Sequence, residues 1–427
     1  MKNGNKLFYG WWIVTAITII SFTTAATPFS VVLKQLMQEF NSGRGMVSLA
    51  PSISMIAGGI TGIVVGRLLK TRKPKIFMLY GAIIGGLSLL LISIAHSLWT
   101  LYVFFFLLGV AVGGITMISM FSLLSKWFTR KWGTAVGFAT AGGAVGNMAI
   151  TPLYALIMNT FGWRATYVLS GLLVLLIDIP LICFVLKDSP ESMGLYSDGI
   201  KTNIPEESET IPRENAGVKL TISDYLKRFP LWLIGISLAL VAIGDNAVMQ
   251  HQVSFLTDMN ISTTIAASAL GFTFGISIIA KLGSGWLADR ISTRYVTILF
   301  LILEVAGIFV LMKANTISKV WLFVVIYGLG AGAAGTLMPL IIREVFGSAY
   351  FSILFSFANI LYTAGAVIGI PLAGFIFDAT ASYSMVFVIV ASAYMAAILG
   401  IYIAFGINPK PIMLTSPQKG VSYGYER

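Results

Sequence analysis

The stretch "ISIIAKLGSGWLADRISTR", Ile276 to Arg294, joins an apolar segment to a charged turn, and Lys281 lies inside the apolar part. At about 1.5 Å of rise per helical residue, this lysine sits about 12 Å from the turn at Asp289. Ser277, Lys281 and Ser284 share one helical face by their spacing. The lysine is therefore a functional group, part of a structural ion pair, or a side chain that extends to the membrane interface, and the rest of the chain must decide among these.

The composition of the chain indicates a membrane protein. Of the 427 residues, 57% are hydrophobic and 11% are charged, whereas about a quarter are charged in soluble domains. The mean hydropathy is +0.88. Such a chain cannot cover itself with polar surface, so its solvent is a lipid bilayer. The one cysteine, Cys183, excludes a disulfide within the chain.

Twelve apolar runs reach or approach the length of about 20 residues that a helix needs to cross a bilayer. Only helices satisfy their own backbone groups there, so we expect an all-α fold. An even number of crossings puts both termini on one side. The expected spans are 10–36, 46–67, 75–96, 99–123, 133–160, 165–187, 230–257, 262–288, 296–313, 320–342, 349–377 and 383–406.

The distribution of basic residues predicts the orientation. Of the 28 lysines and arginines, the connections away from the termini hold only Lys34, Arg44, Arg164, Lys313 and Lys319. The positive-inside rule then places both termini and the central loop in the cytoplasm. The net charge of +11 is explained by this topology, and we expect no nucleic-acid partner.

A long polar stretch, rich in Pro, Ser and Glu, divides the spans six and six. We expect an N-terminal half at 1–187, a largely disordered cytoplasmic linker at 188–229 with a short interfacial helix at 222–229, a C-terminal half at 230–406, and a cytoplasmic tail at 407–427. "GRLLKTRKPK" (Gly66–Lys75) follows the second span as "GWLADRISTR" (Gly285–Arg294) follows the eighth. Two parallel six-helix halves predict a transporter with its substrate site between them.

The segment Gly285–Arg294 resembles the loop signature of the major facilitator superfamily. Gly285, Asp289, Arg290 and Arg294 stand at its glycine, acidic and basic positions. The resemblance implies the major facilitator fold of two pseudo-symmetric six-helix halves. It also implies a gate at this loop, in which the glycine lets two helices approach and the charges latch the cytoplasmic side. In the first-half copy, Lys70 replaces the acid.

Shorter motifs look like the monocarboxylate transporter branch and its bacterial relatives, which include oxalate–formate exchangers. They are "YGWWIV" (Tyr9–Val14), "WFTRKWGTAVGFATAGGAVG" (Trp127–Gly146), "FGWRATY" (Phe161–Tyr167) and "DSPESMGLYSDG" (Asp188–Gly199). The resemblance implies transport of a small carboxylate, often with a proton, and Lys281 matches the arginine that binds the carboxylate in this branch. Phe29 and Ser277 replace the lysine and aspartate of animal members, so that proton-coupling pair does not carry over.

The polar residues of the seventh and eleventh spans complete the expected site. "GDNAVMQHQ" (Gly244–Gln252) is unusually polar for a spanning helix. Asp245 is the expected proton carrier or counter-ion of Lys281, with a packed polar helix break as the alternative. His251 is either a proton relay or an interfacial histidine with satisfied hydrogen bonds. We expect the substrate to contact Lys281, Asn246, Gln250, Asn359 and Tyr362.

Two further acids lie in the spans. Asp178, just before Pro180, is expected to cap freed backbone donors, and Glu304 has no evident partner. No catalytic, metal-binding or cofactor motif appears, so we expect neither an enzyme nor a cofactor. The expected function is proton-coupled transport of a small monocarboxylate such as lactate or pyruvate across the cell membrane by a monomer. The alternatives are organic-anion antiport, proton-driven export of apolar compounds, and a sensor on a transporter scaffold.

Overall fold

The computed structural model describes residues 8–69, 71–115, 117–129, 131–199, 228–347 and 351–407, and structural statements refer to these ranges. Regular structure in these ranges is helical. The N-terminal elements are α1 Gly10–Ala25, α2 Phe29–Phe40, α3 Arg44–Leu68, α4 Pro74–Ser93, α5 Leu98–Ile115, α6 Met117–Trp127, α7 Trp132–Leu173, η1 Val174–Asp178, η2 Leu181–Val185, η3 Pro190–Met193 and η4 Ser197–Gly199. The C-terminal elements are α9 Phe229–Asp258, α10 Thr263–Ala288, α11 Thr293–Met312, α12 Ile317–Ala331, α13 Ala334–Phe346, α14 Phe351–Thr380 and α15 Ser384–Gly406.

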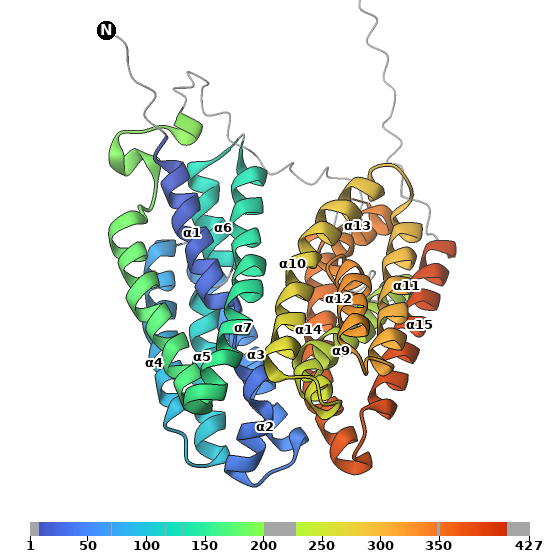
Figure 1. Ribbon diagram of the computed structural model, residues 1–427. Coiled ribbons are helices and arrows are strands. Elements are labelled where there is room, and N and C mark those ends of the chain that lie inside the picture. The colour runs from blue at the N-terminus through green and yellow to red at the C-terminus, as the bar shows by residue number, and fades with distance from the viewer. Residues whose placement is uncertain are drawn as a thin grey trace, which may run out of the picture.

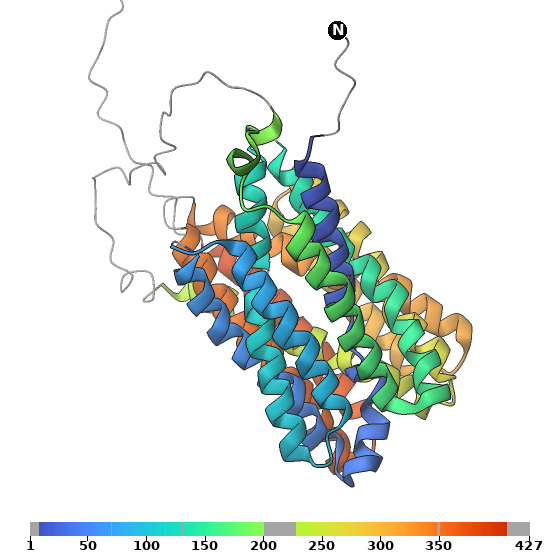
Figure 2. The same ribbon diagram turned by 90° about the vertical axis from the view of Figure 1, so that its left-hand side faces the viewer.

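The helices form two bundles that stand side by side (Figure 1), and the long axes of the helices remain roughly aligned in the turned view (Figure 2). One bundle holds α1 to η2 and the other holds α9 to α15. The described chain begins and ends at the same end of the bundles. We call this end the terminal side and the other end the opposite side.

The described residues contain twelve crossings, as the sequence predicts. Eleven apolar helical stretches are long enough to span a membrane, and one of them, Thr134–Val185, has 52 residues. A straight helix of that length would measure about 78 Å, against about 30 Å of hydrocarbon. At Gly162 the backbone has φ 82° and ψ 174°, which turns the chain back. This stretch therefore crosses twice, and the other ten cross once each.

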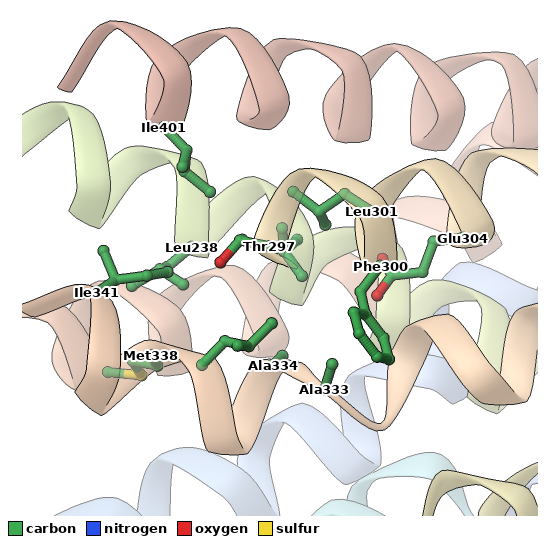
Figure 3. A pocket seen from close by; sticks show the side chains of 12 residues that line it. Leu238, Thr297, Phe300, Leu301, Glu304, Ala333, Ala334, Met338, Ile341 and Ile401 are labelled. Carbon is green, nitrogen blue, oxygen red and sulfur yellow. The ribbon is translucent and has the colours of Figure 1, made fainter. Parts of the chain in front are cut away.

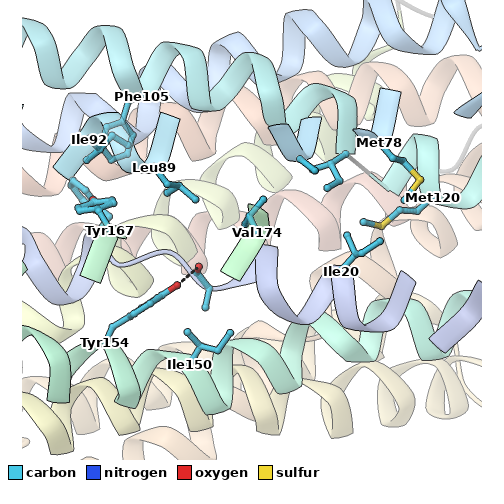
Figure 4. Packing of buried hydrophobic residues seen from close by; sticks show 14 of the residues in the cluster. Ile20, Met78, Leu89, Ile92, Phe105, Met120, Ile150, Tyr154, Tyr167 and Val174 are labelled. Carbon is cyan, nitrogen blue, oxygen red and sulfur yellow. Dashed lines mark hydrogen bonds between the residues drawn. The ribbon is translucent and has the colours of Figure 1, made fainter. Parts of the chain in front are cut away.

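The first span is broken where the sequence places Pro28. α1 ends at Ala25 and α2 begins at Phe29, because proline cannot donate the hydrogen bond that would continue the helix. The Ala26 carbonyl freed by the break accepts a hydrogen bond of 3.3 Å from the Tyr154 hydroxyl. Figure 4 shows this bond inside the apolar core of the N-terminal bundle, beside Ile150 and Val174. The break thus opens the first span beside buried hydroxyl groups.

In each half, a matching pair of glycines lets two helices pack closely. In α7, a Cβ atom at Gly142 or Gly146 would overlap the α1 carbonyl oxygens of Thr18 and Phe22. In α14, a Cβ atom at Gly365 or Gly369 would overlap the α9 carbonyl oxygens of Ala239 and Ile243 in the same way. Small residues four apart let two membrane helices approach closely. The two pairs occupy corresponding helices of the two halves, so the pseudo-symmetry of the fold extends to these individual helix contacts.

We expect Gly146→Ala to destabilise the protein by about 1–3 kcal/mol, because the added methyl group overpacks a backbone contact. The check is thermal unfolding of the detergent-purified protein. Gly137→Ala on the same helix is the matched control, since a Cβ atom there has nothing within 4 Å. Equal melting temperatures for the two variants would contradict the proposed role of Gly146.

The start of the expected linker packs on the N-terminal bundle. The Asp198 carboxylate accepts a hydrogen bond of 3.0 Å from the Thr129 backbone N–H, and the Ser197 hydroxyl donates to the Lys126 carbonyl at 3.0 Å. Most of the linker, including most of the expected interfacial helix at 222–229, lies outside the described residues, as does nearly all of the expected tail.

Candidate functional site

The two halves meet most tightly toward the opposite side. α10 approaches α7 where a Cβ atom at Gly271 would lie 2.9 Å from the Met148 carbonyl oxygen. α3 approaches α14 where the Ser52 hydroxyl donates to the Val367 carbonyl at 2.7 Å. The cross-half hydrogen bonds and ion pairs gather on this side. The site between the halves is therefore closed toward the opposite side in this conformation.

A charge cluster secures this closure. The Arg44 guanidinium is 5% exposed, contacts the Asp258 carboxylate at 2.8 Å, and lies 3.5 Å from the centroid of the Phe377 ring. Lys34 also contacts Asp258, at 2.6 Å. The Asp378 carboxylate accepts hydrogen bonds of 2.8 Å from the backbone N–H groups of Arg44 and Gly45. We call Lys34, Arg44, Asp258 and Asp378 the outer latch.

His251 belongs to the region of this latch. Its Nδ1 lies 2.9 Å from the Tyr383 hydroxyl, and its Nε2 lies 2.9 Å from the Ile370 carbonyl oxygen. Ser48 of the other half lies 3.4 Å from Nε2. Both ring nitrogens thus have partners, and the side chain is 1% exposed. This geometry favours the histidine with satisfied hydrogen bonds over a relay in the substrate path.

A cavity of about 720 Å³ lies between α1, α3, α4 and α5 and reaches the C-terminal half. Its wall follows α3 from Pro51 to Gly66, near the terminal end of that helix. Its polar lining includes Thr23, Thr24, Thr27, Ser54 and Ser170. A cavity of this size accommodates a small organic molecule with its hydration water.

Two of the expected substrate contacts line this cavity. Gln250 of α9 and Asn359 of α14 reach it from the C-terminal half. The Gln250 Oε1 atom is buried without a hydrogen-bond partner among the described residues, so its amide is available to a ligand. Lys281, Asn246 and Tyr362 are not among its lining residues, and the Asn246 amide donates to its own helix at the Ala242 carbonyl, at 3.0 Å. The structure therefore gathers only part of the expected set.

Lys281 lies where the two halves separate. Gly271 and Gly275 face α7, and Leu282 follows on the same face of α10 by helical spacing. Leu282 is nevertheless 73% exposed, so α7 no longer covers α10 at that level. Lys281 is exposed beside it, and no carboxylate lies within ion-pair distance among the described residues. The structural ion pair is thus absent in this conformation.

Asp245 does not approach Lys281. Its Oδ1 atom accepts hydrogen bonds from the Tyr394 hydroxyl at 2.8 Å and from the Tyr327 hydroxyl at 3.3 Å, inside the C-terminal bundle. The expectation that Asp245 is the counter-ion of the lysine is therefore not met here. The spacing of residues shows which face of a helix a side chain occupies, but not which helix packs against that face. The face of α9 that carries Asp245 packs against α12 and α15.

Asp178 has a hydroxyl partner instead of backbone donors. Its Oδ1 atom accepts a hydrogen bond of 2.7 Å from Thr23, which lines the cavity. The carboxyl group is fully buried and its Oδ2 atom has no partner in the described part of the chain. The expected capping role is thus wrong for this conformation, and the helix runs on through Pro180, whose backbone is helical at φ -58° and ψ -42°.

The expected gating loop is not engaged. A Cβ atom at Gly285 would meet Thr336 at 3.5 Å, an ordinary contact, so the close approach that we expect at this glycine is not present. Arg290 lies over the Trp286 ring at 3.6 Å and Arg294 over the Tyr402 ring at 3.7 Å. Asp289 is exposed at the end of α10. With the halves apart on this side, the loop has nothing to latch.

Glu344 and the two acids of the outer latch are functional candidates that the sequence pattern did not indicate. Glu344 accepts hydrogen bonds from the Ser292 hydroxyl at 2.7 Å and the Thr293 N–H at 3.0 Å, so it holds the start of α11. Asp258 and Asp378 lie just beyond the ends of their expected spans. Counting basic residues gives the orientation of the chain but not the partners of these residues. Acids at the ends of neighbouring spans, on the same side as Lys34 and Arg44, could have predicted the latch.

Comparison with known proteins agrees with the fold. The Major Facilitator Superfamily family model matches residues 12–364 and 256–423. Rat "Monocarboxylate transporter 13" is 25% identical over 92% of this chain and 88% of its own length. Rat "Monocarboxylate transporter 4" is 25% identical over 97% and 87%. The "Uncharacterized MFS-type transporter YcxA" of Bacillus subtilis is 22% identical over 88% and 90%.

Among solved structures, a bacterial homolog to the human lysosomal transporter Spinster, in an inward-facing and unoccupied conformation, superposes with a TM-score of 0.68. It is 14% identical, and the match covers 95% of this chain and 96% of that one. Twelve crossings in two halves, the family match along most of the chain and these relatives agree with one another. The chain belongs to the major facilitator superfamily of multi-pass membrane transporters, within which it resembles the monocarboxylate transporter branch.

Proposed function

We propose that this protein carries a small monocarboxylate, together with a proton, across the cell membrane by alternating access. The termini then face the cytoplasm, and the terminal side is the inner side. Lys281 carries the proposal: it is an exposed cation deep in a membrane helix, without an ion-pair partner in the described ranges. When the transporter closes around this lysine and water leaves, the charge needs a counter-charge, and a substrate carboxylate supplies one.

The separation of charges within the C-terminal half supports the same proposal. Asp245 and Glu304 are buried, at 7% and 1% exposure, away from the lysine. Gln250 and Asn359 reach the cavity as neutral hydrogen-bonding groups. The lysine is thus free for the substrate anion, and the acids are free to hold protons.

The closed outer latch and the separated terminal side support alternating access. In this conformation the substrate enters or leaves from the terminal side. Transport then requires the outer latch to open while the loop at Asp289, Arg290 and Arg294 closes. The gating role of that loop belongs to this proposal.

We expect liposomes that contain the purified protein to accumulate radiolabelled lactate when their interior is more alkaline than the bath. The proton gradient then drives the anion inward. Lactamide, the neutral amide, is the matched control solute and should not accumulate. Accumulation that follows a preloaded internal anion but ignores the pH gradient would replace symport by organic-anion antiport. Equal handling of lactate and lactamide would overturn the proposal.

A further inference from the structure

Two carboxyl groups lie close together in the core of the C-terminal bundle. Both groups contact α12 within one helical turn: Tyr327 hydrogen-bonds to Asp245 of α9, and Gly330 packs on Glu304 of α11. Within the described residues, no lysine, arginine or histidine forms an ion pair with either group. Two negative charges without a cation are strongly disfavoured in a low-dielectric interior. The pair therefore requires at least one proton.

The hydroxyl groups around Asp245 have too few hydrogens for their contacts. Asp245 Oδ1, the Tyr327 hydroxyl and the Tyr394 hydroxyl form a triangle with sides of 2.8, 3.0 and 3.3 Å. The two tyrosines supply one hydrogen each, so if both donate to a carboxylate oxygen, none is left for the 3.0 Å contact between the hydroxyl groups. A protonated Asp245 supplies the third hydrogen when Oδ1 donates to the Tyr327 hydroxyl, Tyr327 donates to Tyr394, and Tyr394 donates to Oδ1. The geometry thus fits the neutral acid better than the carboxylate.

Glu304 lies on the terminal side of this triangle. α11 and α12 approach closely at Gly330, where a Cβ atom would lie 2.6 Å from Glu304 Cγ, and at Gly307, where it would lie 2.7 Å from Tyr327 Cβ. Tyr327 and Gly330 share one face of α12 by spacing. The two glycines thus hold the Glu304 backbone against the helix that carries Tyr327.

A small cavity lies beside Glu304, on the way toward the terminal side. Its volume is about 20 Å³, enough for one water molecule, and Glu304, Phe300, Thr297 and Ile341 are among its lining residues. Figure 3 shows Glu304 and Phe300 at one end of this pocket and Ile341 at the other. Thr297 is about 10 Å nearer the start of α11 than Glu304. The Glu304 Oε2 atom has no hydrogen-bond partner among the described side chains.

We propose that Glu304 and Asp245 form a paired proton site, in which Glu304 exchanges protons with the terminal side through the small cavity and Asp245 stores them in the tyrosine triangle. The site deepens the proposed function, and its role in transport rests on that function. The titratable groups that face the pair are Tyr327 of α12, Tyr362 of α14 and Tyr394 of α15. In the described chain, α10 and α13 present no titratable group to it.

The test that does not depend on transport is infrared difference spectroscopy of the purified protein during a pH titration. Protonated carboxylic acids give a carbonyl band that shifts in D₂O. We expect one such band to be lost in Asp245→Asn and another in Glu304→Gln, while a band from the buried Asp178 of the other half should remain in both variants. Because the groups interact, each substitution should also move the titration midpoint of the other band of the pair. Glu191→Gln, at an exposed carboxyl group, is the matched control.

Two results would overturn the paired site. One is a Glu304→Gln variant in which the Asp245 band titrates as in the wild type. The other is a titration that changes when Na⁺ replaces K⁺, which would make the pair a sodium site. A folded variant is recognised by an unchanged gel-filtration profile. If Glu304→Gln does not fold, Glu304→Asp, which keeps the acid, should shift the band without removing it, and an unshifted band would also overturn the proposal.

The transport assay separates this inference from the proposed function. In liposomes, both Asp245→Asn and Glu304→Gln should lose accumulation driven by a pH gradient while retaining exchange of internal for external lactate, since exchange needs no net protonation. If the wild type neither accumulates nor exchanges lactate, the proposed function is overturned but the infrared result still stands. A variant that still accumulates lactate would remove its residue from the coupling mechanism.

Discussion

Replacement of Lys281 by glutamine should weaken lactate binding about 10- to 100-fold and leave a folded protein. A hydrogen bond to a charged group contributes about 1.5–3 kcal/mol, and each 1.4 kcal/mol is about a factor of ten in affinity. Glutamine keeps a polar, unbranched side chain, shorter by about one atom, but removes its charge. Folding should be unaffected, because the lysine is exposed and has no ion pair to lose among the described residues.

Lactate-dependent thermal stabilisation of the detergent-purified protein measures this effect, because a ligand stabilises the state that it binds. Lys281→Arg is the matched variant: it keeps the charge and should keep most of the binding, with altered selectivity among carboxylates because a guanidinium is planar and an ammonium is not. Normal lactate binding by Lys281→Gln would leave the lysine without a role in substrate recognition. The anion-transporter proposal would then lose its main support.

The sequence predicted the number of crossings and the division into halves because both depend on segment length and apolar content. The break at Pro28 was also accessible, since a proline fixes where a helix loses a hydrogen bond. The turn at Gly162 was predicted as well, since the expected spans end at 160 and begin again at 165, and the backbone leaves the helical conformation at Gly162. Properties that belong to one segment were thus within reach.

The contacts between segments could not be predicted from the sequence. Asp245 was expected to meet Lys281, yet it faces Tyr327 and Tyr394, because helix tilt and packing decide which neighbour a polar face meets. Glu304 had no evident partner in the sequence for the same reason. Gln250 and Asn359 line the cavity as expected, whereas Lys281, Asn246 and Tyr362 are not among its lining residues. Most of the expected substrate site thus depends on packing that spacing does not encode.

The outer latch is the second place where a single substitution should have a large effect. Asp378 belongs to the C-terminal half but accepts from the first N–H groups of α3 in the N-terminal half. A carboxylate at a helix N-terminus gains both charge-assisted hydrogen bonds and a favourable dipole interaction. Opening this side removes those partners, so the contact stabilises the closed state alone. Asp378→Asn loses the charge and one acceptor oxygen.

We therefore expect Asp378→Asn to shift the conformational equilibrium toward states that are open on the opposite side. The loss of about 1–2 kcal/mol, a typical value for a helix N-cap, changes the ratio of states about 5- to 30-fold. Spin labels at Gln38 and Ala379, which are exposed on the two halves, report the separation by pulsed electron resonance after Cys183 is replaced by serine. The label distance should lengthen or become bimodal.

Glu39→Gln is the matched control for this experiment. Glu39 contacts Arg164 at 2.7 Å on the same side of the protein, but both residues belong to the N-terminal half. Breaking that pair removes an ion pair without releasing the other half, so the label distance should stay as in the wild type. If Asp378→Asn also leaves it unchanged, the latch does not set the equilibrium. The stacking of the Arg44 guanidinium on Phe377 and the packing at Gly271 would then hold the halves closed instead.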